Sequence, residues 1–173
     1  GGEYFSPFLY WHLNMWHTEV DQADGGDKYT NPDLRDNEWI AFNDYDEVCK
    51  NPKIYTLCGA RQLIKTEFEC SLTLRELSLY RNTEAMGIFQ ADEDKDTFVK
   101  KMRTAIEYGE RFIIVPNIDK SWDKKEIRFG VTRQDNSIDL RGTLYLYNTQ
   151  EGKKVQVGAG KTPTFFFGDE IAK

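Results

Sequence analysis

The sequence predicts a single α+β domain in which two helices pack on a mainly antiparallel sheet of about five or six strands. The chain has 173 residues, 39% of them hydrophobic and 14% aromatic, which is enough to bury one substantial core. Two long segments have the apolar spacing of helices, whereas the last third of the chain alternates short apolar segments with turn residues. Because two helices are too few to supply every crossover of a parallel sheet, we expect antiparallel strands.

The first predicted helix begins at Ser6 and Pro7 and ends at Gly25 and Gly26. A serine hydroxyl caps free amides, and proline suits the first turn, where its missing N–H is not needed. The helix carries two adjacent apolar stripes, the first being Leu9, Leu13, Trp16, Val20 and Ala23 and the second Phe8, Trp11 and Met15. One stripe is enough to pack a helix on a sheet. We therefore expect the second stripe to be available to a partner.

The middle of the chain predicts a loop, a strand and the second helix. Residues 27–53 are acidic and rich in Asn, Asp and Pro, which predicts a long ordered loop with a short strand or one turn of helix. Apolar and polar residues alternate over 66–74, which predicts a half-exposed strand, and residues 75–89 fit a second strand with a loop. The second helix, amphipathic and with acids in its first turn, begins near Asp92 and ends at Gly109.

The last third of the chain predicts further strands, at residues 112–115, 126–133, 143–148, 153–157 and 164–167. Turn-forming residues at 135–137 and 150–152 predict hairpin connections between them. We find no repeat and no linker, so one domain is expected to span residues 1–173, with residues 1–2 interpreted as a cloning remnant. No apolar segment approaches the roughly 20 residues that a membrane-spanning helix needs.

Charge is distributed unevenly along the chain. The formal net charge is -6, and residues 1–52 carry 11 acidic and 3 basic side chains, whereas residues 53–173 carry 18 and 20. A continuous basic stripe that could follow a phosphate backbone is missing. This pattern argues against non-specific binding of duplex nucleic acid as the main task.

Two motif-like strings lack residues that their ligands require. Gly-Ala-Gly-Lys-Thr at residues 158–162 ends like a phosphate loop, but Val155 occupies the position of the required earlier glycine and Pro163 follows at once. Three alternating aspartates from Asp92 resemble the opening of a calcium loop. Thr97 and Arg103 stand where that loop needs glycine and glutamate. We therefore expect a turn and a helix start rather than nucleotide and calcium sites.

The histidines and cysteines do not predict a metal site or another cofactor. His12 and His17 are separated by five residues, about 140° around a helix, which makes a shared metal ion difficult. Cys49, Cys58 and Cys70 are an odd set without a Cys-x-x-Cys motif, and we interpret them as small apolar residues. An oxidised pair of Cys49 and Cys58 stays open if the protein is secreted.

The most economical functional hypothesis is a non-enzymatic interaction or assembly domain. Its partner surface would be the acidic, aromatic-rich N-terminal helix, with Phe8, Trp11 and Met15 as contact residues for a protein partner or a second copy. We assign no catalytic residue, because no serine, cysteine or lysine stands in a recognisable nucleophile setting.

Two alternative functions use other parts of the sequence. The first is a ligand-binding module for a glycan or single-stranded nucleic acid, in which Tyr145, Tyr147 and Arg128 share one face of the sheet. The second is a carboxylate-dependent hydrolase, for which the acids between Glu38 and Glu47 are candidates. Two converging acids in a pocket would favour the enzyme, and a flat aromatic patch would favour assembly.

Overall fold

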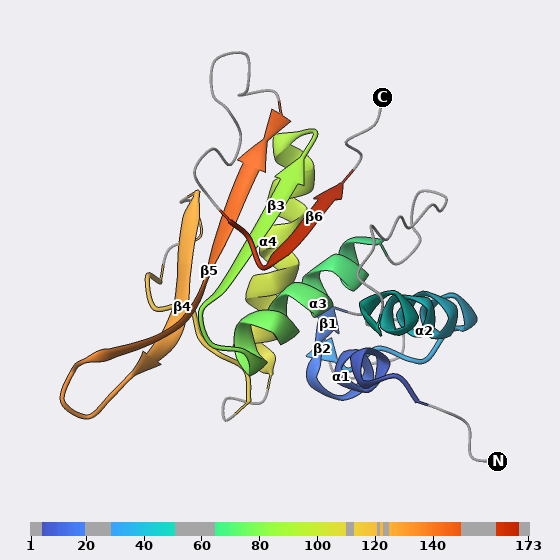
Figure 1. The fold of residues 1–173 in the computed structure, drawn as a ribbon, viewed down its shortest axis with the longest axis horizontal. Helices are drawn as coiled ribbons and strands as arrows, with labels where there is room; N and C mark the ends of the chain where they lie inside the picture. The colour runs from blue at the N-terminus through green and yellow to red at the C-terminus, as the bar shows by residue number, and fades with distance from the viewer. Residues whose placement is uncertain are drawn as a thin grey trace.

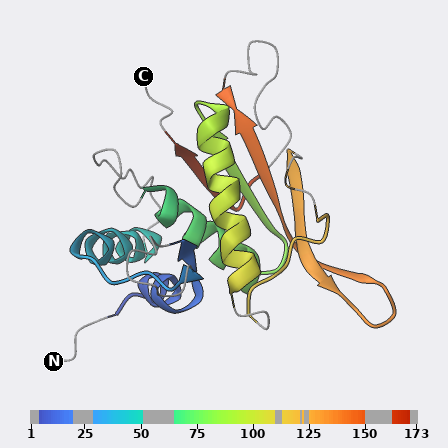
Figure 2. The same cartoon turned by 180° about the vertical axis from the view of Figure 1, so that it is seen from behind.

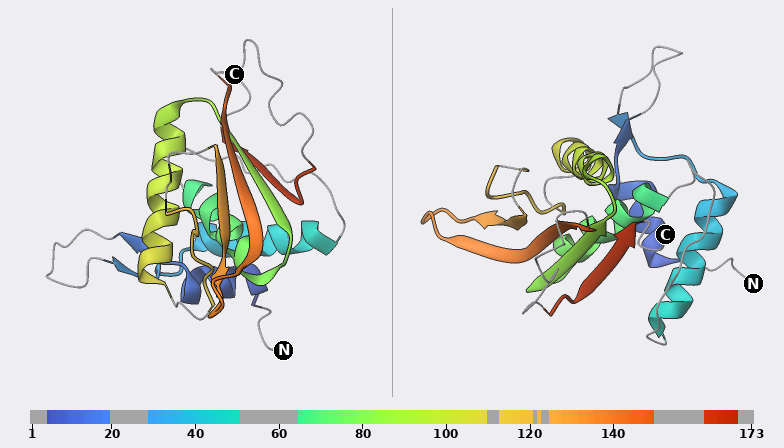
Figure 3. Two further views of the ribbon diagram at one scale, coloured as in Figure 1. Left: turned by 90° about the vertical axis from the view of Figure 1, so that its left-hand side faces the viewer. Right: turned by 90° about the horizontal axis from the view of Figure 1, so that it is seen from above.

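The computed structural model describes residues 5–19, 29–50, 65–109, 113–120, 122, 125–149 and 162–169. In these residues the chain forms an α+β fold, with helices packed on one face of a sheet (Figures 1, 2 and 3). The elements are α1 (Pro7–Met15), β1 (Thr18–Glu19), β2 (Tyr29–Thr30), α2 (Asp36–Lys50), α3 (Lys65–Leu79), β3 (Thr83–Phe89), α4 (Asp92–Tyr108), β4 (Glu126–Thr132), β5 (Ile138–Asn148) and β6 (Phe165–Asp169). None of the helices in the described ranges has the length and apolar character to cross a membrane.

The main sheet is mixed, so the prediction of a mainly antiparallel sheet of five or six strands was wrong. Its four strands have the order β4-β5-β3-β6, while β1 and β2 form a separate antiparallel pair. Strand β3 pairs in parallel with both β5 and β6, and only β4 and β5 are antiparallel. Helix α4 lies between β3 and the β4–β5 hairpin in the chain and covers the sheet (Figure 2). Helix α4 lies in the connection that follows β3, whereas β6 joins the other edge of β3 only after β5 has ended. The two parallel pairs therefore involve only one helix between strands among the described residues.

The core lies between the sheet and helices α3 and α4. Phe98 of α4 packs against Phe89 and stacks on Phe167, with ring centroids 5.3 and 5.0 Å apart. Gly87 leaves the space that the Phe167 ring fills, since a Cβ there would lie 2.5 Å from its Cζ atom. A small residue on β3, Gly87, therefore lies beside a large one on β6, Phe167, so that the two neighbouring strands pack without a clash.

Helix α3 replaces the strand that alternation predicted over residues 66–74. The helix is buried along most of its length, including its small polar residues Ser71 and Thr73. The Thr73 hydroxyl donates a hydrogen bond to the carbonyl of Glu69, 2.7 Å away, so this buried polar group has its partner within the helix. An element covered on several sides needs no single apolar stripe, so neither helical nor strand periodicity identifies it reliably.

Helix α2 occupies much of the segment predicted as a long ordered loop. It begins where the Glu38 carboxylate accepts a hydrogen bond from the backbone N–H of Arg35, 3.1 Å away. Such a contact satisfies an amide that the helix start leaves free. Apart from Ala41 and Phe42, few apolar residues of α2 are buried, which is why its sequence resembled a loop.

The two helices that the sequence did predict differ in their ends. Helix α1 begins at Pro7 as expected, and the Ser6 hydroxyl accepts a hydrogen bond from the N–H of Phe8. It ends at Met15 rather than at Gly25 and Gly26, because the chain turns to an extended conformation at Trp16. Helix α4 confirms the second prediction, with acids in its first turn and Gly109 as its C-cap.

Most described strands of the last third confirm the sequence prediction. Strands β4, β5 and β6 correspond to the segments predicted at 126–133, 143–148 and 164–167. Residues 113–115 form no strand, and residues 150–157 lie outside the described residues. The turn at 135–137 joins β4 to β5 as a hairpin, as predicted.

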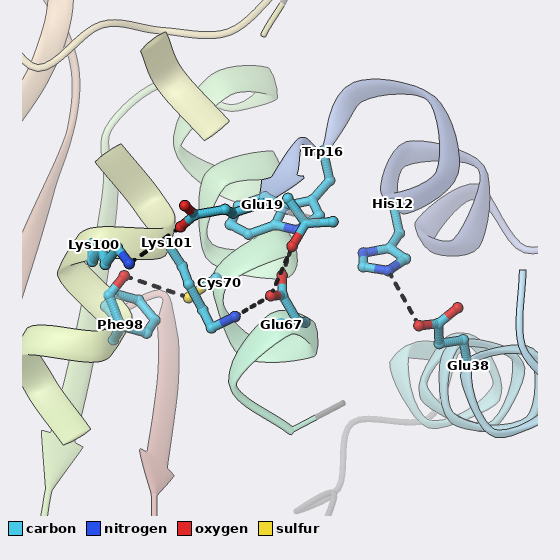
Figure 4. Close-up of polar contacts among 10 residues, drawn as sticks. His12, Trp16, Glu19, Glu38, Glu67, Cys70, Phe98, Lys100 and Lys101 are labelled. Atoms are coloured by element: carbon cyan, nitrogen blue, oxygen red, sulfur yellow. Dashed lines mark hydrogen bonds and ion pairs between the residues drawn. The ribbon is translucent and has the colours of Figure 1, made fainter. Parts of the chain in front are cut away.

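The Glu67 carboxylate on α3 ties together three elements (Figure 4). Its Oε2 accepts a hydrogen bond from Trp16 Nε1, 2.6 Å away, and its Oε1 accepts one from Thr18 Oγ1, 3.1 Å away. Lys101 of α4 donates to the same Oε1 atom. The end of α1, the start of α3 and the middle of α4 are thereby fixed relative to one another.

We predict that Glu67→Gln lowers the free energy of unfolding by about 1.5–3 kcal/mol, the usual contribution of hydrogen bonds to a charged group. Urea denaturation of the purified variant measures the change. The matched control is Glu107→Gln on α4, which breaks an exposed pair with Arg103 and should change stability little. Equal losses in the two variants would show that Glu67 is an ordinary surface acid.

Candidate functional site

The described surface contains an apolar groove beside α1, with a volume of about 610 Å³. We call it the α1 groove. Its walls come from α1 and the residue Phe5 before it, from the end of α3 and from the segment after α4. They are formed by Phe5, Pro7, Tyr10, Trp11, Met15, Arg75, Leu79 and Ile113. Most of these side chains are apolar or aromatic, and a groove of this size can hold several side chains of a partner.

The groove has an exposed rim and a buried floor. Tyr10 on α1 and Leu79 on α3 are 55% and 47% exposed, and Phe5 is also exposed. Trp11 is only 4% exposed and packs in the main core. Exposed large apolar side chains gathered around one hollow are typical of binding surfaces, whereas scattered ones are not.

Packing against α2 sets the position of α1 and therefore of the groove. The Ser6 hydroxyl donates to the carbonyl of Phe42, 3.3 Å away, at the point where α1 begins. The Phe8 ring packs edge-on against Tyr45, with centroids 5.0 Å apart. These contacts fix α1 on α2, and Phe8 also contacts Arg75 of α3.

A buried arginine supplies the polar group of the groove. The Arg75 guanidinium bonds to Glu76 at 2.8 Å and lies over the Phe8 ring, 4.3 Å from its centroid. Burial raises the pKa of Glu76, and the neighbouring Arg75 partly opposes that rise. The guanidinium is thus held between a carboxylate and an aromatic face. This arrangement fixes its orientation without using all of its N–H donors.

Two tryptophans near α1 differ in the partners of their indole N–H groups. Trp16 is fully buried and donates to Glu67. The Trp11 Nε1 atom is also shielded from solvent but makes no hydrogen bond with any described residue. A buried donor without an acceptor costs about 1–3 kcal/mol, so this N–H on the groove floor is an uncommon feature.

The three predicted contact residues of α1 have different environments. Trp11 and Met15 line the α1 groove, whereas Phe8 is half-buried between Arg75 and Tyr45. Helix α1 contains no Asp or Glu, so its surface is apolar and aromatic rather than acidic. The structure therefore brings two of the three residues to one hollow.

Sequence reasoning missed Tyr10, Leu79 and Arg75 as parts of this hollow. Tyr10 belongs to neither apolar stripe of α1, and it is the most exposed of the rim residues. Leu79 and Arg75 lie on α3, the helix that was predicted as a strand and a loop. No local signal could place them beside α1, because their position depends on how α3 crosses the fold.

The predicted sheet surface is less accessible than the groove. Strand register places Arg128 opposite Thr143 and one step from Tyr145, so the three predicted residues share a face. Arg128 Nη2 donates to Asp119 Oδ1, 2.6 Å away, and Tyr145 is only 5% exposed. Tyr147 is half-buried.

The other candidate residues lie outside the groove. The His12 ring is buried, and its Nε2 atom lies 3.9 Å from Glu38, beyond hydrogen-bond distance, so neither ring nitrogen bonds to a described residue (Figure 4). His17 contacts the Met15 carbonyl. On α2, Asp46 and Glu47 both pair with Lys50. Across the described ranges, no three His, Cys, Asp or Glu side chains group as metal ligands would.

The sulfur and phosphate-loop candidates add no site within the described ranges. Cys70 is buried, whereas Cys49 is a free, exposed thiol whose pKa is raised by partial burial. A thiol with a raised pKa is a poor nucleophile. Residues 158–161 of the phosphate-loop string lie outside the described residues, and Asp92 pairs with Lys95 in the first turn of α4.

Comparisons with protein families, with curated proteins and with solved structures gave no match to this chain. Any functional assignment therefore depends on the geometry of the described residues.

We predict that Trp16→Phe lowers the free energy of unfolding by at least about 1.5 kcal/mol more than Trp11→Phe. Both changes remove similar volume from buried sites, but only Trp16→Phe leaves a charged acceptor with one fewer donor. Chemical denaturation of both purified variants measures the difference. Similar losses would mean that the Trp11 N–H has an acceptor in the folded protein.

Proposed function

We propose that the protein is a non-enzymatic interaction domain that binds an apolar segment of a protein partner in the α1 groove. The observation that carries the proposal is the exposed rim of Phe5, Tyr10 and Leu79 around a floor of buried aromatic surface. Large apolar and aromatic side chains provide most of the binding energy in protein interfaces.

One polar feature supports a partner that also brings a hydrogen-bond acceptor. The Arg75 guanidinium lines the groove, and its pairing with Glu76 leaves other N–H donors of the fork. A backbone carbonyl or a carboxylate of the partner would accept a hydrogen bond from this guanidinium. Such a contact orients an apolar segment that hydrophobic burial alone would not. The Trp11 indole N–H is shielded from solvent and is not offered to a partner.

The described lining of the groove offers few groups for catalysis. Among the described residues it contains no serine, cysteine, histidine, lysine, aspartate or glutamate. Tyr10 is the one described lining residue of a type that serves as a general acid, a general base or a nucleophile. We therefore favour binding over hydrolysis at this place.

The alternative function on the sheet face has weaker support. Stacking on a base or a sugar needs an accessible aromatic face and a free cation. Tyr145 is nearly buried and Arg128 is engaged by Asp119.

We predict that the double variant Tyr10→Ser, Leu79→Ser weakens partner binding at least tenfold and leaves the fold intact, because both side chains are about half exposed. A photo-reactive phenylalanine at position 10 first captures the partner in cells, and calorimetry with the purified partner then measures the affinity. A crosslinked product of twice the chain mass would identify the partner as a second copy.

The matched control is Ile40→Ser on α2, which removes an equally exposed apolar side chain outside the groove. It should leave the affinity unchanged, and a photo-reactive residue at position 40 should not capture the same partner. Equal capture at both positions, or an unchanged affinity in the double variant, would reject the α1 groove as the binding surface.

A further inference from the structure

The β4–β5 hairpin extends beyond the body of the sheet and carries an unusual group of charges (Figures 1 and 2). Arg133 and Arg141 lie on the hairpin, and Arg81 lies in the turn between α3 and β3. All three contact the carboxylate of Asp139 on β5. We call Arg81, Arg133 and Arg141 the arginine cluster, which shares no residue with the lining of the α1 groove.

The contacts within the cluster are long. Asp139 Oδ2 lies 3.4 Å from Arg133 Nη2, 3.5 Å from Arg81 Nη2 and 3.8 Å from Arg141 Nε. Charge-assisted hydrogen bonds between such groups are typically about 2.7–2.9 Å. In addition, Arg141 Nε is shielded from solvent and makes no hydrogen bond with any described residue. One carboxylate thus holds three guanidinium groups near each other without saturating their donors.

Three other described arginines have a different arrangement. Arg75, Arg103 and Arg128 each pair with one carboxylate, at 2.8, 2.7 and 2.6 Å. Their charges are neutralised one to one. The arginine cluster instead combines three positive charges with one negative charge, a local excess of positive charge although the whole chain is acidic.

Two of the three arginines face solvent. The side chains of Arg81 and Arg133 are 62% and 58% exposed, whereas those of Arg141 and Asp139 are 28% and 16% exposed. An anion arriving from solvent therefore meets guanidinium donors first. Lysines would present point charges, but guanidinium groups present planar pairs of donors that match the oxygens of one anion.

We infer that the arginine cluster binds a phosphate group. Three guanidinium groups offer more donors than one carboxylate can accept, whereas the oxygens of a phosphate can accept hydrogen bonds from several arginines at once. Asp139 positions the arginines and also competes with the ligand for them. Free inorganic phosphate and the phosphate of a nucleotide share this chemistry, and the experiment separates the two sources.

The test is a titration of the full chain with sodium phosphate and with adenosine monophosphate, each at constant ionic strength maintained with sodium chloride. The arginine side-chain Nε–H signals in NMR report the binding. We expect saturable shifts at the cluster, and an affinity at least tenfold lower in the double variant Arg81→Gln, Arg133→Gln. Tighter binding of the nucleotide than of phosphate would identify a nucleotide as the source, and equal binding would identify the phosphate alone.

Two further variants distinguish a binding site from a surface ion-pair network. Asp139→Asn removes the competing carboxylate and should raise phosphate affinity several-fold, whereas a network without a ligand would gain nothing. Arg103→Gln, which removes an exposed arginine on α4, should leave the affinity unchanged. Circular dichroism confirms that each variant is folded. Absence of saturable shifts, or equal affinities in the cluster double variant and the Arg103 control, overturns the inference.

Discussion

Helix α3 is the element on which the rest of the fold depends, because it contributes to two groups of buried apolar residues. One group lies between the helices and the sheet, and the other lies between α1, α2 and α3. Phe68 and Leu72 pack with α1 and α2, whereas Leu74 and Leu77 pack against the sheet and α4. A helix that is covered on opposite sides fixes the distance between the layers on either side of it. The Glu67 carboxylate also fixes the orientation of α3 relative to its neighbours, since it accepts hydrogen bonds from the end of α1 and from α4.

The position of α3 also explains where the candidate binding surface lies. The α1 groove exists because the end of α3 and the start of α1 approach each other without closing, and Leu79 and Tyr10 remain exposed on the two sides. The shape of the proposed binding surface therefore depends on how α3 packs in the core. A change deep in the core, such as one at Leu77, would alter the shape of the groove without touching its lining.

The sequence predicted those elements whose signal is local. Helix α4 has an apolar stripe, an acidic first turn and a terminal glycine, and the turn at 135–137 has residues suited to a hairpin. The prediction for α3 failed because burial on several sides removes the single apolar stripe that a periodicity argument detects. The prediction for α2 failed for the opposite reason, since Ala41 and Phe42 are its only buried apolar residues. At the candidate site, Trp11 and Met15 were proposed as contact residues from α1 alone, and the structure places Trp11 in the main core at 4% exposure. Leu79 and Arg75 depend on a contact between helices distant in sequence.

The late arrival of β6 has a consequence for synthesis of the chain. Thr164 bonds to the backbone of Glu84, 80 positions earlier, and β6 pairs along most of β3. Until the ribosome has released β6, one side of β3 has no hydrogen-bonding neighbour and the Phe89 and Phe98 rings lack the cover of Phe167. An open strand edge beside apolar surface is a template for pairing between nascent chains. Between completion of β5 and completion of β6, the nascent chain therefore exposes an edge of β3 that a neighbouring chain could pair with.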